Sequence, residues 1–253
     1  MDLGLRGKTA LITGGCKGIG RGCSEILAEE GCNVVMVFRS HAEESQRFAE
    51  ELAQRTGVRT LALQGDVADP SITDELFDQA IDAFGSVDIL INNAGGNTCV
   101  CPFDALTDGQ WRYAQDQNLN SAFLMSRRFI RDCRMHKRGG HIVNVISKSA
   151  LTTNSQNNTP YVSAKGGLMT MTRGLANEVT KDGIFVNGIV PGYVRTERGH
   201  LPGSERAKRV QPLLPTGEFA TPRDMGAVVA FLCSPLAKQI IGAIVDCTGG
   251  LML

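Results

Sequence analysis

The sequence predicts an α/β fold, with one doubly wound parallel sheet of about seven strands and helices on both faces. Short apolar runs alternate with amphipathic stretches along all 253 residues, which is the pattern of repeated strand–helix–strand units. The run NVVMVF at 33–38 is apolar throughout, as expected of a parallel strand covered on both faces. Because no linker, repeat or low-complexity tract breaks the alternation, we expect residues 1–253 to form a single domain.

Boundary residues and periodicity define the individual elements. The first strand, 8–14, ends in a glycine, and the helix that follows over 18–30 has one apolar face and a glycine just beyond its end. The same reasoning predicts further strands over 33–38, 59–64, 87–92, 141–146, 184–190 and 243–247, and further helices over 42–55, 71–84, 111–136, 161–180 and 223–233. In the irregular insertion 195–221, three prolines prevent a long helix.

Composition and charge exclude several classes of protein. Hydrophobic residues make up 42% and charged residues 21%, which is typical of a globular protein and not of a disordered one. The 26 basic and 26 acidic residues balance, so we expect no nucleic-acid partner. No apolar run approaches the roughly 18 residues that span a bilayer, and no signal peptide is recognisable. We therefore expect a cytoplasmic protein that does not bind membranes.

The eight cysteines and four histidines do not form a recognisable metal site. No C-x-x-C occurs, and no histidine stands at zinc-finger spacing from a cysteine. We expect reduced thiols, several of them buried, and no bound metal. Cys99 and Cys101 form a C-x-C, which leaves a metal or redox pair open.

A glycine-rich turn follows the first strand, and ligands of doubly wound sheets bind beyond the carboxyl ends of the strands. The segment TGGCKGIG at 13–20 has glycines at Gly14, Gly18 and Gly20, which allow a tight turn and a close approach of the backbone. The helix after it offers unpaired N–H groups and a positive dipole end. These features predict a site for the pyrophosphate of a dinucleotide.

The end of the second strand bears on which dinucleotide binds. An NAD enzyme usually has an acidic residue here for the ribose 2′-hydroxyl, but no acid occurs between 31 and 42. Arg39 stands in that place, and Lys17 in the glycine-rich turn could reach it as well. Two cations and no carboxylate favour the 2′-phosphate of NADP(H), while use of NAD(H) remains open.

Further motifs stand at strand ends and helix starts in a fixed order. They are TGGCKGIG at 13–20, Asp66-Val67, NNAG at 92–95, Asn118, Ser147, YVSAK at 161–165, Pro191-Gly192 with Thr196, and Gly249-Gly250. On these motifs the whole chain resembles the short-chain dehydrogenase/reductase family of the compact type, including members that reduce 3-oxoacyl groups on acyl carrier protein. The resemblance implies a single-domain Rossmann fold and an enzyme that interconverts a ketone and a secondary alcohol.

The resemblance also implies which residues bind the cofactor. The expected cofactor-binding residues are Gly14, Cys16, Lys17, Gly18, Ile19, Gly20, Arg39, Asp66, Val67, Asn93, Ala94, Gly95, Tyr161, Lys165, Pro191, Gly192, Val194 and Thr196. Within this set, Asp66 and Val67 would contact the adenine, and the segment from Pro191 to Thr196 would contact the nicotinamide carboxamide. Lys165 would hold the nicotinamide ribose.

Tyr161 and Lys165 carry the expected chemistry. They are four residues apart on a predicted helix, so their side chains share one face. A phenol with a pKa near 10 is a poor acid or base at neutral pH, and a nearby ammonium is expected to lower that pKa. Tyr161 would then give a proton to a ketone oxygen as hydride arrives, or take one from an alcohol.

Two further catalytic residues are implied. Ser147 would hydrogen-bond the substrate oxygen, with Ser149 as the alternative, and Lys148 between them departs from the family pattern. Asn118 would kink the helix at 111–136 and hold a water that links Lys165 to bulk solvent.

The substrate stays open between two classes. The first is a ketone reduced with NADP(H), for which a 3-oxoacyl thioester is one candidate. The second is a sugar or secondary alcohol oxidised with NAD(P), and a catalytically silent dinucleotide sensor is a less favoured third hypothesis.

The insertion 195–221 would act as a lid over the substrate. A net-basic stretch at 127–138 and basic residues in the lid could face an acidic carrier. The resemblance implies a homotetramer.

Overall fold

The computed structural model describes residues 1–152, 156–197 and 203–252. Over these residues, seven parallel strands form one sheet in the order β3-β2-β1-β4-β5-β6-β7. The strands are β1 (Thr9–Thr13), β2 (Asn33–Phe38), β3 (Thr60–Gln64), β4 (Ile89–Asn92), β5 (Gly140–Val145), β6 (Ile184–Pro191) and β7 (Ile244–Cys247). The predicted doubly wound parallel sheet is confirmed.

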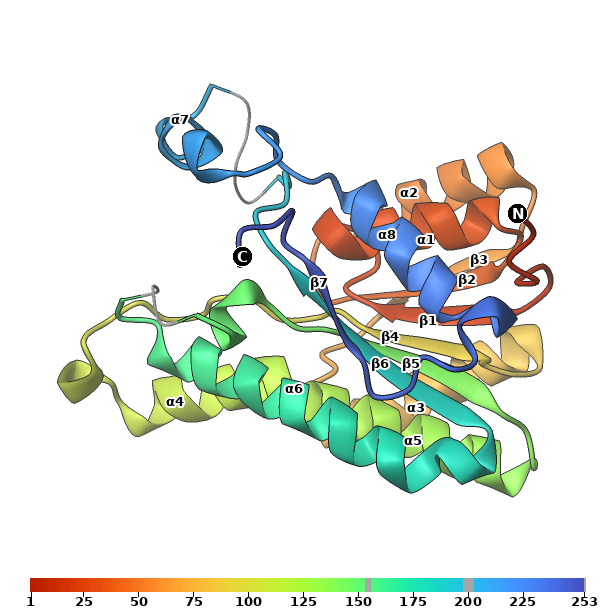
Figure 1. Ribbon diagram of the computed structural model, residues 1–253. Coiled ribbons are helices and arrows are strands. Elements are labelled where there is room, and N and C mark those ends of the chain that lie inside the picture. Colours follow the sequence, from red (N-terminus) through yellow and green to blue (C-terminus); the bar gives the residue numbers. More distant parts are fainter. Residues whose placement is uncertain (153–155, 198–202, 253) are drawn as a thin grey trace.

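Helices cover both faces of the sheet (Figure 1). One face carries α1 (Gly18–Glu29), α2 (Ala42–Thr56) and α8 (Pro222–Leu232), and the other carries α3 (Pro70–Phe84), α5 (Ser121–Met135) and α6 (Thr159–Val179). Two apolar clusters fill the space between the sheet and these two helix layers. Along the described ranges, no helix is both long enough and apolar enough to cross a membrane.

The order of the strands places a crevice at the centre of the sheet. β1 pairs with β2 on one side and with β4 on the other, so the connections run in opposite directions from this point. The turns after β1 and β4 therefore diverge above the carboxyl edge, and ligands of such sheets bind in that gap. Thr13 at the end of β1 and Asn92 at the end of β4 mark its floor.

The prediction of one continuous helix over 111–136 is wrong. The structure has α4 (Asp108–Gln115), one π-helical turn (Asp116–Asn120) and then α5. Helix α4 begins earlier than the predicted residue 111, because the side chains of Thr107 and Gln110 form a reciprocal capping box. Periodicity does not reveal a π-helical turn, because adjoining α-helical turns preserve the apolar pattern.

The described part of the insertion at 195–221 contains only short helical segments, as the prolines predicted. The short helix α7 (Glu205–Val210) begins after Ser204, whose hydroxyl accepts a hydrogen bond from the amide of Ala207. A 3₁₀ turn (Gln211–Leu213) follows it. This segment projects beyond the carboxyl edge of the sheet (Figure 1). Arg198, which contributed to the predicted basic character of the lid, lies outside the described residues.

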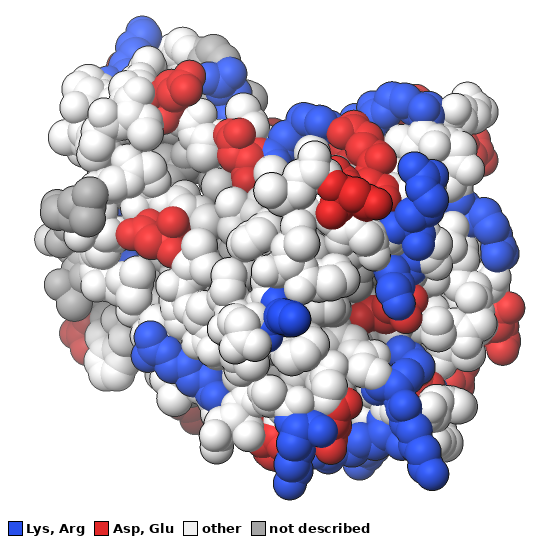
Figure 2. Space-filling model, turned by 45° about the vertical axis from the view of Figure 1, so that its right-hand side comes forward, with Lys and Arg blue, Asp and Glu red and all other residues white. Residues whose placement is uncertain are grey.

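The basic stretch at 127–138 is paired with acids that are distant in sequence. Arg128 contacts Asp74 and Asp78 of α3, and Arg134 contacts Asp182 beyond α6. The face drawn in Figure 2 likewise shows basic and acidic side chains interspersed. The fold therefore supplies Arg128 and Arg134 with counter-charges that the sequence of this helix alone does not show.

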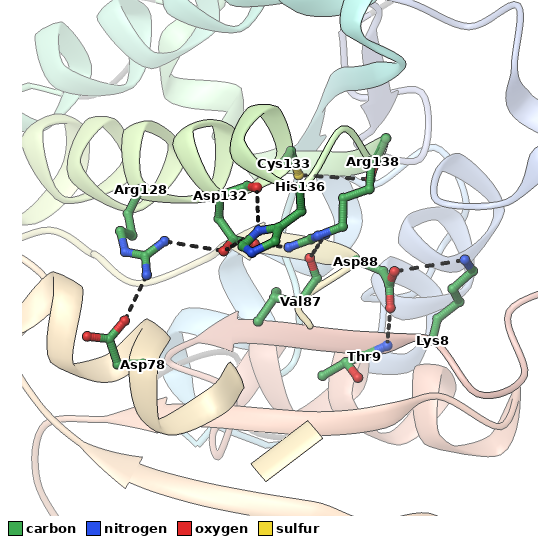
Figure 3. Close-up of polar contacts among 11 residues, drawn as sticks. Lys8, Thr9, Asp78, Val87, Asp88, Arg128, Asp132, Cys133, His136 and Arg138 are labelled. Carbon is green, nitrogen blue, oxygen red and sulfur yellow. Dashed lines mark hydrogen bonds and ion pairs between the residues drawn. The ribbon is translucent and has the colours of Figure 1, made fainter. Parts of the chain in front are cut away.

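A buried carboxylate, Asp132, anchors the end of α5 (Figure 3). Its side chain is 3% exposed and contacts Arg138, which also donates to the carbonyl of Val87 at 2.6 Å. Arg128 and His136 approach the same carboxylate at 3.7 and 3.3 Å. The cluster lies near the amino ends of the strands and so stabilises the edge of the sheet opposite the crevice.

We expect His141 to make stability depend on pH below about 6.5. Burial, and to a smaller extent the charge of Lys8, lowers the pKa of His141 to about 4, with nearby Asp88 opposing the shift. The unfolded chain then binds more protons between pH 4 and 6.5, so the free energy of unfolding falls as the pH is lowered through this range. In urea titrations at pH 5 and 7.5, His141→Asn should lose less stability than the wild type. An equal loss would contradict this assignment.

Candidate active site

A cavity of about 780 Å³ opens at the carboxyl edge of the sheet. Its size is that of a small-molecule or cofactor site. Most of the residues expected at the site line it: Gly14, Cys16, Lys17, Gly18, Ile19, Arg39, Asp66, Val67, Asn93, Ala94, Gly95, Ser147, Tyr161, Lys165, Pro191, Gly192 and Thr196. The fold thus brings into one cavity residues that are up to about 180 positions apart in the sequence.

Gly20 lies behind the glycine-rich turn and does not line the cavity. A Cβ atom there would stand 2.1 Å from the carbonyl oxygen of Gly14 and 2.5 Å from Nδ2 of Asn93. That amide donates to the carbonyl oxygens of Thr13 and Gly14 at 2.9 and 3.2 Å, which ties the turn to the segment after β4. Gly20 is therefore needed for the turn to close.

A carboxylate faces the backbone N–H at the start of α1. Oε2 of Glu197 accepts a hydrogen bond from the amide of Gly18 at 3.1 Å, and Thr196 packs beside the same glycine. An anion is thus placed where the N-terminus of α1 favours negative charge. Glu197 was not predicted from the sequence, although its position directly after Thr196 could have indicated it.

The two cations expected at a 2′-phosphate both have partners within the protein. Nζ of Lys17 lies 3.0 Å from Glu44 in the first turn of α2. The guanidinium of Arg39 donates to Gln117 at 2.8 Å and to the hydroxyl of Tyr113 at 3.1 Å, and lies 3.4 Å from Asp66. Glu44, Tyr113 and Gln117 were not predicted, because α2, α4 and the π-helical turn reach the site only in the folded chain.

The segment after β4 is held in place by Thr13. Its hydroxyl accepts hydrogen bonds from the amides of Asn93 and Ala94, both at 2.9 Å. Asp66, after β3, caps its own turn by accepting from the amide of Ala68 at 3.0 Å. These contacts give the cavity one wall of fixed backbone.

Asn118 is buried and sits in the π-helical turn. Its amide accepts from the N–H of Gly96 at 2.8 Å and donates to the carbonyls of Gly96 and Ala114, each at 3.0 Å. Asn118 thus fastens the π-helical turn to the segment after β4. It does not itself line the cavity.

Lys165 is buried beneath the catalytic end of the cavity. Its Nζ donates to the carbonyl oxygen of Val145 at 2.8 Å, and burial lowers its pKa to about 8. Burial raises the pKa of Tyr161, while a hydrogen bond with Ser147 opposes that shift. The expectation that Lys165 lowers the pKa of this phenol is not met here, because desolvation is the larger effect and the ammonium points to Val145.

The turn after β5 separates the two candidate serines. Ser147 lines the cavity beside Tyr161, whereas Ser149 is buried and its amide donates to the hydroxyl of Ser147 at 3.2 Å. Nζ of Lys148 lies 4.4 Å from the ring centre of Tyr193, so its charge is directed towards the segment after β6. The geometry therefore favours Ser147 over Ser149 as the serine that reaches a substrate.

Val194 lies outside the cavity. Its side chain is buried, and its backbone forms an isolated bridge with Ala220. It holds together the two ends of the projecting segment, which places Pro191, Gly192 and Thr196 at the cavity wall.

Known proteins resemble this chain over nearly its whole length. A family model described as enoyl-(acyl carrier protein) reductase matches residues 14–252. A 3-oxoacyl-[acyl-carrier-protein] reductase of Aquifex aeolicus is 32% identical over 252 residues, covering 99% of this chain and 100% of that protein. This chain belongs to the short-chain dehydrogenase/reductase family.

Other members of the family show how widely its substrates vary. An L-rhamnose 1-dehydrogenase (NAD(P)(+)) of Sphingomonas is 31% identical and covers 98% of this chain and 97% of its own length. The crystal structure of L-sorbose reductase from Gluconobacter frateurii, complexed with NADPH and L-sorbose, has a TM-score of 0.91 at 30% identity, covering 100% of this chain and 99% of that one.

This short-chain dehydrogenase/reductase is therefore an NAD(P)-dependent oxidoreductase that acts on CH–OH or C=O groups. The residues present fit such a cofactor. The N-terminus of α1 already carries an anion, the carboxylate of Glu197, and Gly20 leaves no room for a side chain where the turn closes. Clusters of three or more metal-ligating side chains are absent from the described part of the chain.

Proposed function

We propose that this enzyme interconverts a ketone and a secondary alcohol with a preference for NADP(H), using Tyr161 as the general acid and base. The observation that carries the proposal is the meeting of Tyr161, Lys165 and Ser147 in the same cavity as the glycine-rich turn. A dinucleotide bound along this turn would reach the tyrosine with its nicotinamide end. When bound, the reduced nicotinamide supplies the hydride.

Each of the three residues has a distinct task in the reduction. Ser147 donates a hydrogen bond to the ketone oxygen and orients it beside the phenol. Tyr161 gives its proton to that oxygen as negative charge develops on it. The burial that raises the pKa of Tyr161 keeps the phenol protonated before the reaction, which suits an acid. In the oxidation direction the same residue takes the proton.

Lys165 and Asn118 are proposed to resupply that proton. Lys165 has a pKa of about 8, so its ammonium can release a proton near neutral pH. Asn118 holds the π-helical turn against Gly96, close to the cavity wall. In this proposal a water at Asn118 links the ammonium to bulk solvent.

The NADP(H) preference is proposed to rest on Arg39. We expect Arg39→Ala to weaken NADPH binding at least about tenfold, since a hydrogen bond to a charged group contributes roughly 1.5–3 kcal/mol. NADH binding should change by less than about twofold, because the 2′-hydroxyl offers no charge. Fluorescence titration with each cofactor measures both dissociation constants. The control is Arg59→Ala, whose guanidinium lies on Phe84 and donates to Ala83. Equal weakening of both cofactors by Arg39→Ala would contradict the preference.

We expect Glu197→Gln to tighten the binding of NADPH and NADH about three- to fivefold. The Glu197 carboxylate takes up the N–H of Gly18 that a pyrophosphate would use, and it adds a negative charge beside the phosphates. Equilibrium titration of both cofactors checks this, with the exposed lid residue Glu218→Gln as the control. Unchanged or weaker binding would show that Glu197 does not compete with the cofactor.

The substrate is proposed to bind between the turn after β5 and the lid 195–221. A 3-oxoacyl thioester is one candidate, supported by the relative that reduces such groups on acyl carrier protein. A sugar is the alternative, supported by the relatives named for L-rhamnose and L-sorbose and by the polar sequence LTTNSQNNTP at 151–160. Residues 153–155 of that sequence lie outside the described ranges.

Cofactor turnover with a panel of compounds tests the function. Acetoacetyl thioesters, small ketones and polyols would each be assayed with both cofactors by absorbance at the nicotinamide band. Turnover of a thioester or ketone with NADPH supports the reductase, and turnover of a polyol supports the alternative. Tight cofactor binding without turnover of any compound would favour the catalytically silent sensor.

A cytoplasmic location of the protein stays a prediction.

A homotetramer is also proposed. Exposed apolar side chains stand on α4 and α5, among them Trp111, Tyr113 and Phe123, and others lie near the end of α8 and before β7, among them Phe231 and Ile241. The family resemblance implies pairing through the helices predicted at 111–136 and 161–180 and through the last strand, so Trp111, Tyr113, Phe123 and Ile241 lie on or next to two of these elements. Sedimentation of the purified protein tests the assembly.

A further inference from the structure

Two cysteines outside the catalytic machinery lie against each other. The Sγ atoms of Cys99 and Cys101 are 3.3 Å apart, in the loop that follows β4 and the cavity wall. Both side chains are partly exposed, whereas the other six cysteines are buried. A reagent in solution therefore meets these two thiols first.

The backbone holds the pair in this arrangement from two sides. The amide of Cys101 donates to the carbonyl oxygen of Asn157 at 3.0 Å, and the amide of Cys99 lies 3.3 Å from Oδ1 of Asn97. Val100 between them is 66% exposed, so the intervening side chain points to solvent while both sulfurs face one another. A disulfide needs about 2.05 Å between the sulfurs, so they must approach by only about 1.3 Å.

We propose that Cys99 and Cys101 are a redox modification site, at which a peroxide oxidises the pair to a disulfide within the loop. The Cys99 thiolate attacks the peroxide, the O–O bond breaks, and a sulfenic acid forms with release of water. The Cys101 sulfur then attacks the sulfenic sulfur, the S–O bond breaks, and a second water leaves. Two thiols lose two electrons and two protons, and the peroxide is reduced to two waters.

The contact between the two sulfurs favours the first step. Either thiol can donate the hydrogen bond that joins them, so one can stabilise a thiolate on the other. The thiolate is the nucleophile in such chemistry. A ring closed by residues only two apart is strained, and strained disulfides are the easily reduced ones. The modification is therefore reversible by a dithiol.

The loop connects the pair to the active site. Asn97 and Thr98, directly before Cys99, line the cavity. Asn157, the partner of Cys101, stands two residues before α6, the helix that carries Tyr161. A disulfide would stiffen both segments at the mouth of the substrate pocket. We expect it to raise KM for the substrate about threefold or more, with kcat changed less.

Mass spectrometry of the full-length protein tests the proposal. The protein is treated with a small excess of hydrogen peroxide, alkylated and cleaved after Arg59 and Arg112, which leaves Cys99 and Cys101 as the only cysteines of one peptide. We expect this peptide to lose the mass of two hydrogens and to escape alkylation. Dithiothreitol should restore two alkylation sites. Peptides that stay fully alkylatable, or that gain oxygen without losing two hydrogens, would overturn the proposal.

Variants connect the modification to activity. Cys99→Ser and Cys101→Ser should keep the wild-type KM before peroxide and show no rise after it, whereas the buried-cysteine variant Cys247→Ser should respond like the wild type. If Cys99→Ser shows the same rise in KM as the wild type, the effect belongs to another residue and the coupling to the active site is wrong. The thiol count does not depend on the substrate, so it separates this proposal from the proposed function.

Discussion

Replacing Tyr161 with phenylalanine is expected to lower kcat/KM about a thousandfold while weakening cofactor binding far less. A positioned general acid contributes roughly 10²- to 10⁴-fold, and phenylalanine removes only the hydroxyl that gives the proton. The ring keeps its place on α6, so the cavity that binds the dinucleotide is preserved. Steady-state kinetics gives the loss of activity, and fluorescence titration of NADPH gives the dissociation constant.

Tyr113→Phe is the matched control for this prediction. Tyr113 lines the same cavity, but its hydroxyl accepts a hydrogen bond from Arg39 and is not placed beside Ser147. Its loss should change kcat by no more than about tenfold, since a single hydrogen bond contributes roughly 0.5–1.5 kcal/mol. If Tyr113→Phe and Tyr161→Phe lower kcat/KM equally, the assignment of the acid is wrong.

Asp132→Asn is expected to lower the free energy of unfolding by about 3 kcal/mol. Breaking a buried ion pair costs roughly 3–5 kcal/mol because the remaining charge is left without compensation. Here the remaining charge is Arg138, whose side chain is 20% exposed and is directed inwards at Val87 and Asp132 (Figure 3). Urea denaturation followed by circular dichroism measures the loss.

Asp78→Asn provides the control for the charge cluster. Asp78 pairs with Arg128 at 2.8 Å but is 63% exposed, so its contribution should be no more than about 1 kcal/mol. Asp132→Asn should leave cofactor affinity unchanged, because the cluster lies at the opposite edge of the sheet from the cavity. Equal losses of stability in the two variants would contradict the buried-pair assignment.

The sheet and most helices could be predicted because parallel strands and amphipathic helices leave local patterns. NVVMVF, for example, needs no knowledge of its neighbours to indicate a strand covered on both faces. The residues after the strand ends were also accessible, since strand ends of a parallel sheet meet at one edge. The strand ends thus predicted Gly14 and Ser147 at one edge of the sheet, and the family resemblance added Tyr161, which lines the same cavity.

Contacts between segments that only the fold brings together could not be predicted from the sequence. Glu197 reaches Gly18 across 179 positions, and Arg39 reaches Gln117 across 78. The balance of desolvation against nearby charge is equally non-local, which is why the direction of the pKa shift of Tyr161 was predicted wrongly. The pairing of Arg128 with α3 has the same origin.

Transfer of an isotopic label tests most directly whether this enzyme moves a hydride from NADPH to the carbinol carbon while Tyr161 supplies the proton. NADPH carrying deuterium at both C4 positions of the nicotinamide would be supplied with each compound of the panel that is turned over, and the product alcohol examined by mass spectrometry and NMR. The account predicts one deuterium on the carbinol carbon of each product molecule, with transfer about a thousandfold slower in Tyr161→Phe. Oxidation of the cofactor without deuterium on that carbon, or undiminished transfer in Tyr161→Phe, would contradict it.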